Sequence, residues 1–117
     1  MKRKICDILA PEELIAVREF EEVLKQNFKT KRLSIFGSVA RGEAKDGSDL
    51  DILIILSETV THKIRNLVSD MAFEINLKHS TNISVIIFDE EAWSSVVMKL
   101  TPFYSEVVRE EVAIYET

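Results

Sequence analysis

Apolar residues recur at two spacings along this chain, and the spacing predicts which segments are helices. Between residues 11 and 28, apolar side chains fall three or four positions apart, which predicts an amphipathic helix with Pro11 in its first turn. A second stripe of the same spacing predicts a longer helix that Ser57 or Thr59 caps and that ends near Lys78. The two stripes consist of Val17, Phe20, Leu24, Phe28, Val60, Ile64, Leu67, Val68, Met71 and Ile75.

Three short apolar runs rich in β-branched residues predict strands at 33–36, 50–56 and 83–88. The middle run is apolar on both faces beyond Asp51, which is typical of a central strand covered on both sides. The polar, glycine-bounded stretch from Gly42 to Gly47 predicts the loop before it. Periodicity alone leaves a doubly wound parallel sheet open.

The last third of the chain predicts two more helices and an extended end. Asp89 is an expected N-cap for a helix from about 90 to 100. The apolar side of that helix would be Trp93, Val96, Val97 and Leu100, with Trp93 as a core anchor rather than a base-stacking platform. Thr101-Pro102 then interrupts the chain before a short helix over 103–110 and an extended piece over 112–115.

Length and charge limit the classes of protein that fit. The 117 residues predict a single domain over 1–117. The net charge of −5 argues against a surface that coats a nucleic-acid polymer, although a nucleotide needs only a local positive site. Cys6 is the one cysteine, so no internal disulfide is expected and a reduced, cytoplasmic setting is the simple interpretation. We expect neither a signal peptide nor a membrane span.

Two carboxylates, Asp49 and Asp51, stand at the head of the central strand. Alternate residues of a strand point to one face, so the two side chains project together with Cα atoms about 6–7 Å apart. Like charges at this separation favour a cation or a proton between them. Hard oxygen ligands of this kind suit Mg²⁺, which commonly binds one or two carboxylates together with substrate phosphates.

A glycine turn precedes these carboxylates. Gly37 follows the first predicted strand and opens a short helical turn, so it permits close approach of the backbone to a ligand. Free N–H groups at such a turn favour an anion such as phosphate. Lys31 and Arg32 could steer a phosphate or could be flanking surface charges, and the second interpretation suits most such pairs.

Gly37-Ser38, ten intervening residues and Asp49-x-Asp51 together resemble the signature of the DNA polymerase beta-like nucleotidyltransferase superfamily, and above all its minimal, single-domain members. The resemblance implies an α+β fold with a mixed, about three-stranded sheet packed with helices. It also implies transfer of a nucleoside monophosphate, with Mg²⁺ on Asp49 and Asp51 and phosphates held at Gly37 and Ser38. For Arg41, a phosphate contact and a structural ion pair are equally weighted.

The same resemblance implies a third carboxylate on the next strand, which this chain lacks. The matching position falls at Ser84 or Asn82, while Asp89 and Glu74 lie further away. Two functions therefore remain open: an Mg²⁺-dependent transferase that passes AMP from ATP to a hydroxyl, or a catalytically weak nucleotide-binding or partner-binding module of antitoxin type. The family analogy favours a HEPN-type helical protein partner, or else a homodimer.

Overall fold

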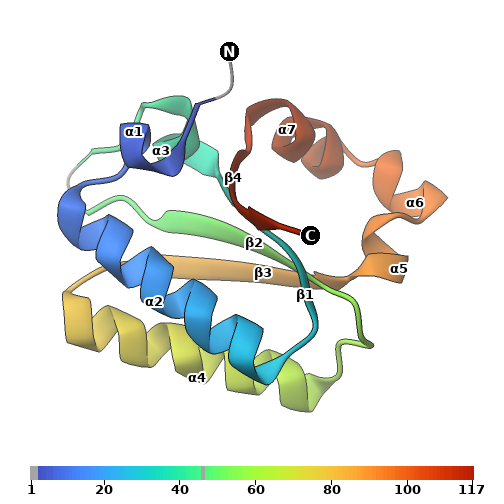
Figure 1. The fold of residues 1–117 in the computed structure, drawn as a ribbon. Coiled ribbons are helices and arrows are strands. Elements are labelled where there is room, and N and C mark those ends of the chain that lie inside the picture. Colours follow the sequence, from blue (N-terminus) through green and yellow to red (C-terminus); the bar gives the residue numbers. More distant parts are fainter. Residues whose placement is uncertain (1–2, 46) are drawn as a thin grey trace.

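The computed structural model describes residues 3–45 and 47–117, and its centre is a four-stranded mixed sheet (Figure 1). The strand order is β3-β2-β1-β4, in which β1 is antiparallel to β2 and β4, and β2 is parallel to β3. The predicted α+β class with a mixed sheet is confirmed, but the sheet has a fourth strand. The elements are α1 (Ile5–Ile8), α2 (Pro11–Asn27), β1 (Thr30–Phe36), α3 (Gly37–Arg41), β2 (Leu50–Leu56), α4 (His62–His79), β3 (Ile83–Asp89), α5 (Glu90–Trp93), α6 (Val96–Lys99), α7 (Pro102–Glu110) and β4 (Val112–Glu116).

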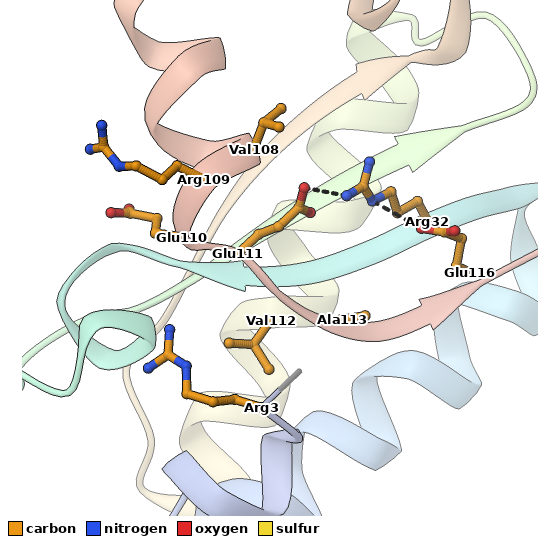
Figure 2. A pocket seen from close by; sticks show the side chains of 9 residues that line it. All are labelled: Arg3, Arg32, Val108, Arg109, Glu110, Glu111, Val112, Ala113 and Glu116. Atoms are coloured by element: carbon orange, nitrogen blue, oxygen red, sulfur yellow. Dashed lines mark ion pairs between the residues drawn. The ribbon is translucent and has the colours of Figure 1, made fainter. Parts of the chain in front are cut away.

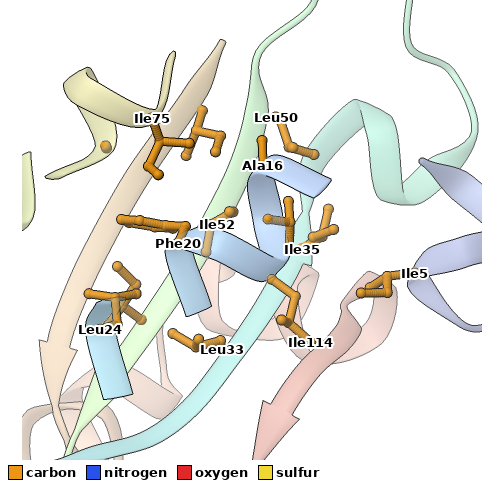
Figure 3. Close-up of a cluster of buried hydrophobic side chains, with 14 of the residues drawn as sticks. Ile5, Ala16, Phe20, Leu24, Leu33, Ile35, Leu50, Ile52, Ile75 and Ile114 are labelled. Carbon is orange, nitrogen blue, oxygen red and sulfur yellow. The ribbon is translucent and has the colours of Figure 1, made fainter. Parts of the chain in front are cut away.

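Helices cover both faces of the sheet, which explains why β2 is apolar on both sides. In Figure 1, α2 and α4 lie side by side on one face, and α5, α6 and α7 lie on the other. The even-numbered residues of β2 pack with Phe20 and Val68 in the larger core (Figure 3). Leu53 and Ile55 pack with Trp93 and Val107 in the smaller one. Asp51 shares the parity of Leu53, so it projects from the face that α5–α7 cover.

The two long helices agree with their predicted spans, but the cap of α4 differs. Pro11 begins α2, where its missing N–H removes no helical hydrogen bond. The N-cap of α4 is Thr61, whose hydroxyl accepts a hydrogen bond from Ile64 N at 3.2 Å, so the expected cap at Ser57 or Thr59 is wrong. Leu67, predicted on the buried stripe, is 41% exposed, while Ala72 is buried instead.

The single helix expected over 90–100 is two short helices. Asp89 caps α5 as predicted, by accepting from Ala92 N at 2.8 Å. The chain then bends, and Ser95 starts α6 by accepting from Met98 N at 3.1 Å. Trp93 is 7% exposed and is the expected core anchor. The remaining residues of the predicted apolar side are exposed, because the bend turns α6 outward: Val96, Val97 and Leu100.

The C-terminal segment closes the sheet. The extended piece predicted after α7 is β4, which pairs with β1 through Val112 opposite Ile35. Glu111 ends α7 in an extended conformation (φ −62°, ψ 149°) rather than the left-handed one that a glycine commonly adopts at this position. The short helix α1 was not predicted from the sequence. Over the described residues, no helix combines the length and apolar character needed to span a membrane.

Candidate functional site

The turn between β1 and α3 brings the backbone against the carboxylate of Asp51. Gly37 begins α3 with φ +79°, a conformation that L side chains rarely adopt. A Cβ at this position would lie 2.3 Å from Oδ2 of Asp51. The backbone at Gly37 therefore permits the expected close approach, but the group that approaches it in this structure is the Asp51 side chain. Because Gly37 has no side chain, the turn can pack directly against the Asp51 carboxylate.

Asp49 and Asp51 lie together at the start of β2, as their spacing predicts. Asp51 is the second residue of the strand, and Asp49 is the exposed residue directly before the strand. Burial raises the pKa of Asp51 above its ordinary value, and the charges of Asp49 and Glu110 raise this pKa further, while Arg41 lowers it. A carboxylate whose ionisation is disfavoured in this way gains most from a bound cation. The pair therefore fits Mg²⁺.

Arg41 forms ion pairs with two glutamates. Its Nε lies 2.8 Å from Oε1 of Glu43, and its Nη1 lies 3.2 Å from Oε2 of Glu110. These two partners, Glu43 first, raise the pKa of the guanidinium. Of the two interpretations weighed for Arg41, the ion pair is the one that the structure shows. The guanidinium remains 43% exposed, so an added anion could still reach it.

Glu110 is a residue of this site that the sequence did not reveal. From the last position of α7, its Oε1 accepts a hydrogen bond from the backbone N–H of Gly37 at 2.9 Å. The same carboxylate accepts from Arg41, and its side chain is only 10% exposed. From the sequence, a glutamate at the end of an amphipathic helix is expected to be a solvated surface charge. Glu110 is also 73 positions away from its partner Gly37. No periodicity along the chain links the two.

A hydroxyl occupies the position where the resemblance implies a third carboxylate. In the parallel ladder, Ser84 of β3 stands directly opposite Asp51, so Ser84 rather than Asn82 is its neighbour. Asp89 pairs with Leu56 at the far end of the strand. Glu74 belongs to α4, which covers the opposite face of the sheet from Asp51. Neither of these two carboxylates can replace the missing one.

No larger metal site exists in the described part of the chain. Within residues 3–45 and 47–117, no three His, Cys, Asp or Glu side chains are placed to hold one ion. The ring of His79 contacts Glu19 instead, with its Nε2 3.0 Å from Oε2. A metal at Asp49 and Asp51 would therefore draw its other ligands from water or substrate, as Mg²⁺ commonly does.

Glu110 also lines a neighbouring pocket of about 450 Å³ (Figure 2). It is walled by charged side chains from the end of α7, from β4 and from β1. Arg32 is paired there with Glu111 and Glu116. Neither Asp49, Asp51 nor Gly37 lines it. Arg32, considered above as a phosphate-steering residue, thus belongs to this pocket rather than to the acidic site. Its charge is already partnered by carboxylates.

Comparison with known proteins gives the family. The family model described as "Nucleotidyltransferase domain" matches residues 17–113. A relative from Methanocaldococcus jannaschii, named as a candidate protein adenylyltransferase, is 31% identical over 93 residues, which cover 78% of this chain and 94% of the relative. A second such relative from the same organism is 49% identical over 43 residues, which cover 37% of this chain and half of the relative.

Solved structures share the fold at low identity. A candidate minimal nucleotidyltransferase superposes with a TM-score of 0.59 at 24% identity, covering 89% of this chain and 95% of the other. A toxin–antitoxin crystal structure with AMP-PNP superposes with a TM-score of 0.62 at 19% identity, covering 86% and 73%. A third is an MNT antitoxin complex with a tri-AMPylated HEPN toxin of Shewanella oneidensis, with a TM-score of 0.57 at 17% identity, covering 91% and 73%.

The matched residues include the glycine turn, the paired aspartates and strands β1, β2 and β3. Two lines of comparison, a family model over most of the chain and a relative aligned along nearly its whole length, agree with the expectation drawn from the motif. The chain belongs to the nucleotidyltransferase domain family.

Proposed function

We propose that this protein transfers AMP from ATP to a hydroxyl group on a protein. The observation that carries the proposal is the contact between Asp51, beside Asp49, and the Gly37 turn. This contact joins a cation-binding pair of carboxylates to a turn with phosphate-binding potential. In the reaction, the acceptor hydroxyl oxygen forms a bond to the α-phosphorus and releases its proton to water, the bond between the α-phosphorus and the bridging oxygen of the β-phosphate breaks, and pyrophosphate leaves.

The residues of the site have separate tasks in this proposal. Asp49 and Asp51 would hold Mg²⁺, which neutralises negative charge on the triphosphate and polarises the attacked phosphoryl group. Ser38, the second residue of α3, is partly exposed, and its hydroxyl would contact a terminal phosphate beside Gly37. Arg41 would approach the phosphates from its half-exposed position. Positioning and charge neutralisation are the main demands of this chemistry.

A protein acceptor is supported by the relatives. Those in Methanocaldococcus jannaschii are named as candidate protein adenylyltransferases, and one structural neighbour is bound to a tri-AMPylated HEPN toxin. We therefore propose a small helical protein of HEPN type as the acceptor, in preference to a second copy of this chain. ATP as the donor is consistent with the neighbour solved with AMP-PNP.

A second candidate is favoured by one observation, the serine opposite Asp51. With Ser84 at the third position, two carboxylates can hold a nucleotide-bound metal but provide a weaker hold on a second ion. The protein would then bind nucleotide and its partner while turning over slowly, as a contact-type antitoxin would. The two candidates share the binding step and differ in the rate of transfer.

Thermal unfolding with and without Mg²⁺ and ATP tests the shared binding step. Binding at one hundred times the dissociation constant stabilises the fold by about 2.7 kcal/mol. At about 4 °C for each kcal/mol, the melting temperature should rise by roughly 10 °C. Asp49→Asn combined with Asp51→Asn should abolish the rise, whereas Asp70→Asn, an exposed carboxylate on α4, should leave it intact. An unchanged melting curve of the wild type would exclude nucleotide binding.

Incubation with labelled ATP, Mg²⁺ and the protein encoded by the neighbouring gene separates the two candidates. Label on the partner at a rate well above the Asp49→Asn, Asp51→Asn variant supports the transferase. A nucleotide-dependent melting shift with no label on the partner supports the binding module.

A further inference from the structure

Glu110 joins the end of α7 to two residues of α3 that are far away in the sequence, Gly37 and Arg41. Its carboxylate accepts the Gly37 N–H at 2.9 Å and pairs with the Arg41 guanidinium, with Oε1 and Oε2 at 3.3 and 3.2 Å from Nη1. The side chain is nine-tenths buried. A carboxylate held in this way, by a backbone donor and a guanidinium together, makes charge-assisted bonds that are stronger than neutral ones.

The bond to Gly37 replaces a cap that the local sequence cannot provide. Phe36 stands at the N-cap of α3 and has no side-chain acceptor for the first N–H groups of that helix. Glu110 accepts the first of them from another element. Since Gly37 has little conformational preference of its own, an external acceptor is what fixes the turn at φ +79°.

The same bond determines where Asp51 can lie. The Cα of Gly37 is packed so closely against the Asp51 carboxylate that a Cβ would lie 2.3 Å from its Oδ2. A shift of the turn would therefore move the Asp51 side chain as well. Glu110 thus acts on the acidic pair through Gly37 and on the guanidinium directly.

We propose that Glu110 is a positioning residue that holds the Gly37 turn and Arg41 in the arrangement that binds a nucleoside triphosphate. The nucleotide ligand in this proposal is taken from the proposed function, whereas the contact between Glu110 and Gly37 does not depend on that function. Glu110 does not need to touch the nucleotide. Its role is to keep the backbone donors, Asp51 and Arg41 in place before the nucleotide arrives.

The test compares Glu110→Ala, Glu110→Gln and the matched control Glu106→Ala, which removes an exposed glutamate one turn earlier on α7. The first readout is hydrogen exchange of the Gly37 amide in nucleotide-free protein. We expect the amide to be protected in the wild type and the control, and exposed in Glu110→Ala. Protection should be retained in Glu110→Gln, whose amide oxygen still accepts the bond. Equal exchange in all four proteins would overturn the proposed contact.

The second readout is the dissociation constant for ATP with Mg²⁺. We expect Glu110→Ala to bind about tenfold more weakly, a change that corresponds to about 1.4 kcal/mol, and Glu110→Gln to recover part of the loss. Glu110→Ala that binds as tightly as the wild type, or more tightly, would overturn the proposal, because Glu110 would then merely compete with phosphate for these donors. Should Glu110→Ala fail to fold, Glu110→Gln still tests the proposal: it removes one of the two charge partners of Arg41, so we expect weaker binding, and binding as tight as in the wild type would overturn the proposal.

The two readouts separate this proposal from the proposed function. If the wild type binds no nucleotide while the Gly37 amide depends on Glu110, the assignment of the nucleotide fails and with it the ligand-positioning role, and only a structural cap remains. If the wild type binds nucleotide and the Glu110 variants bind equally well, the proposed function stands and the positioning role fails.

Discussion

Replacing Gly37 by alanine tests whether the turn is shaped around Asp51. Gly37 and Gly42 have nearly the same backbone conformation, with φ +79° and +75°. A left-handed conformation costs an L residue about 1–2 kcal/mol at either position. Only at Gly37 does the new Cβ meet another atom, Oδ2 of Asp51 at 2.3 Å, while nothing lies within 4 Å at Gly42. Forcing the Asp51 side chain off its preferred rotamer adds about 1 kcal/mol.

Thermal or urea unfolding of the two variants should therefore give different losses. We expect about 1–2 kcal/mol for Gly42→Ala and about 2–3 kcal/mol for Gly37→Ala. At about 4 °C for each kcal/mol, the melting temperatures fall by roughly 4–8 °C and 8–12 °C. In an Asp51→Ala background the clashing oxygen is absent, so the extra loss at Gly37 should disappear. Equal losses at the two glycines, or an extra loss that persists without the Asp51 carboxylate, would refute this reasoning.

Three further predictions follow from the acidic site and the smaller core. Because the pKa of Asp51 is raised in the fold, its ionisation lowers stability as pH rises from its ordinary value of 3.8 through the folded pKa. Asp51→Asn should thus melt higher than the wild type at pH 7 in EDTA, and the gain should vanish below pH 3.8. Ser84→Asp should raise the rate of nucleotidyl transfer, with Ser84→Ala as the control, at tenfold for each ~1.4 kcal/mol of added transition-state stabilisation. No gain over an already active wild type would mean that the third ligand comes from elsewhere. Trp93→Ala should lower the unfolding free energy by about 3–5 kcal/mol in urea titrations, and the exposed Val97→Ala by less than about 0.5 kcal/mol; similar losses would contradict the burial of Trp93.

The elements that the sequence predicted well are those whose apolar pattern directly reports burial in a core. The stripe of α2 and the continuous apolar run of β2 both reflect direct packing in the core, so their ends fall where expected. The prediction of a single helix over 90–100 was wrong because the helical spacing of apolar residues continues across a bend in the chain. Ser95 restarts the helix, and Val96 and Val97 then point outward even though they keep the helical spacing.

The predicted number of strands in the sheet was too low for a related reason. Burial along β4 alternates only at first: Val112 and Ile114 are buried and Ala113 is exposed, but Tyr115 is half-buried and Glu116, the next position on the buried side, is exposed. A shift of register within the pairing with β1, between Leu33 and Ser34, accounts for the irregular pattern. A strand whose ladder is interrupted gives a weak period-two signal.

For the site, spacing predicted the residues that are close in sequence and missed the one that is far away. Asp49 and Asp51 are two positions apart, and their relation follows from strand geometry alone. Ser84 opposite Asp51 required only the parallel register. Glu110 meets Gly37 only because β4 returns along β1 and brings the end of α7 to the turn. Such a relation depends on topology, which local patterns do not carry.

This return of the chain has a consequence for the order of folding. The Gly37 turn lies in the first half of the chain, yet its hydrogen-bond acceptor arrives only with α7, and β1 gains its second neighbour only with β4. Contacts of such sequence separation form late, because a long loop must close before they stabilise anything. During synthesis the amino-terminal half can form the β1–β2 pair while the turn remains uncapped. A nascent chain would therefore reach the geometry that we propose for nucleotide binding only when the last helix and strand dock, so the proposed activity would begin only after folding is complete.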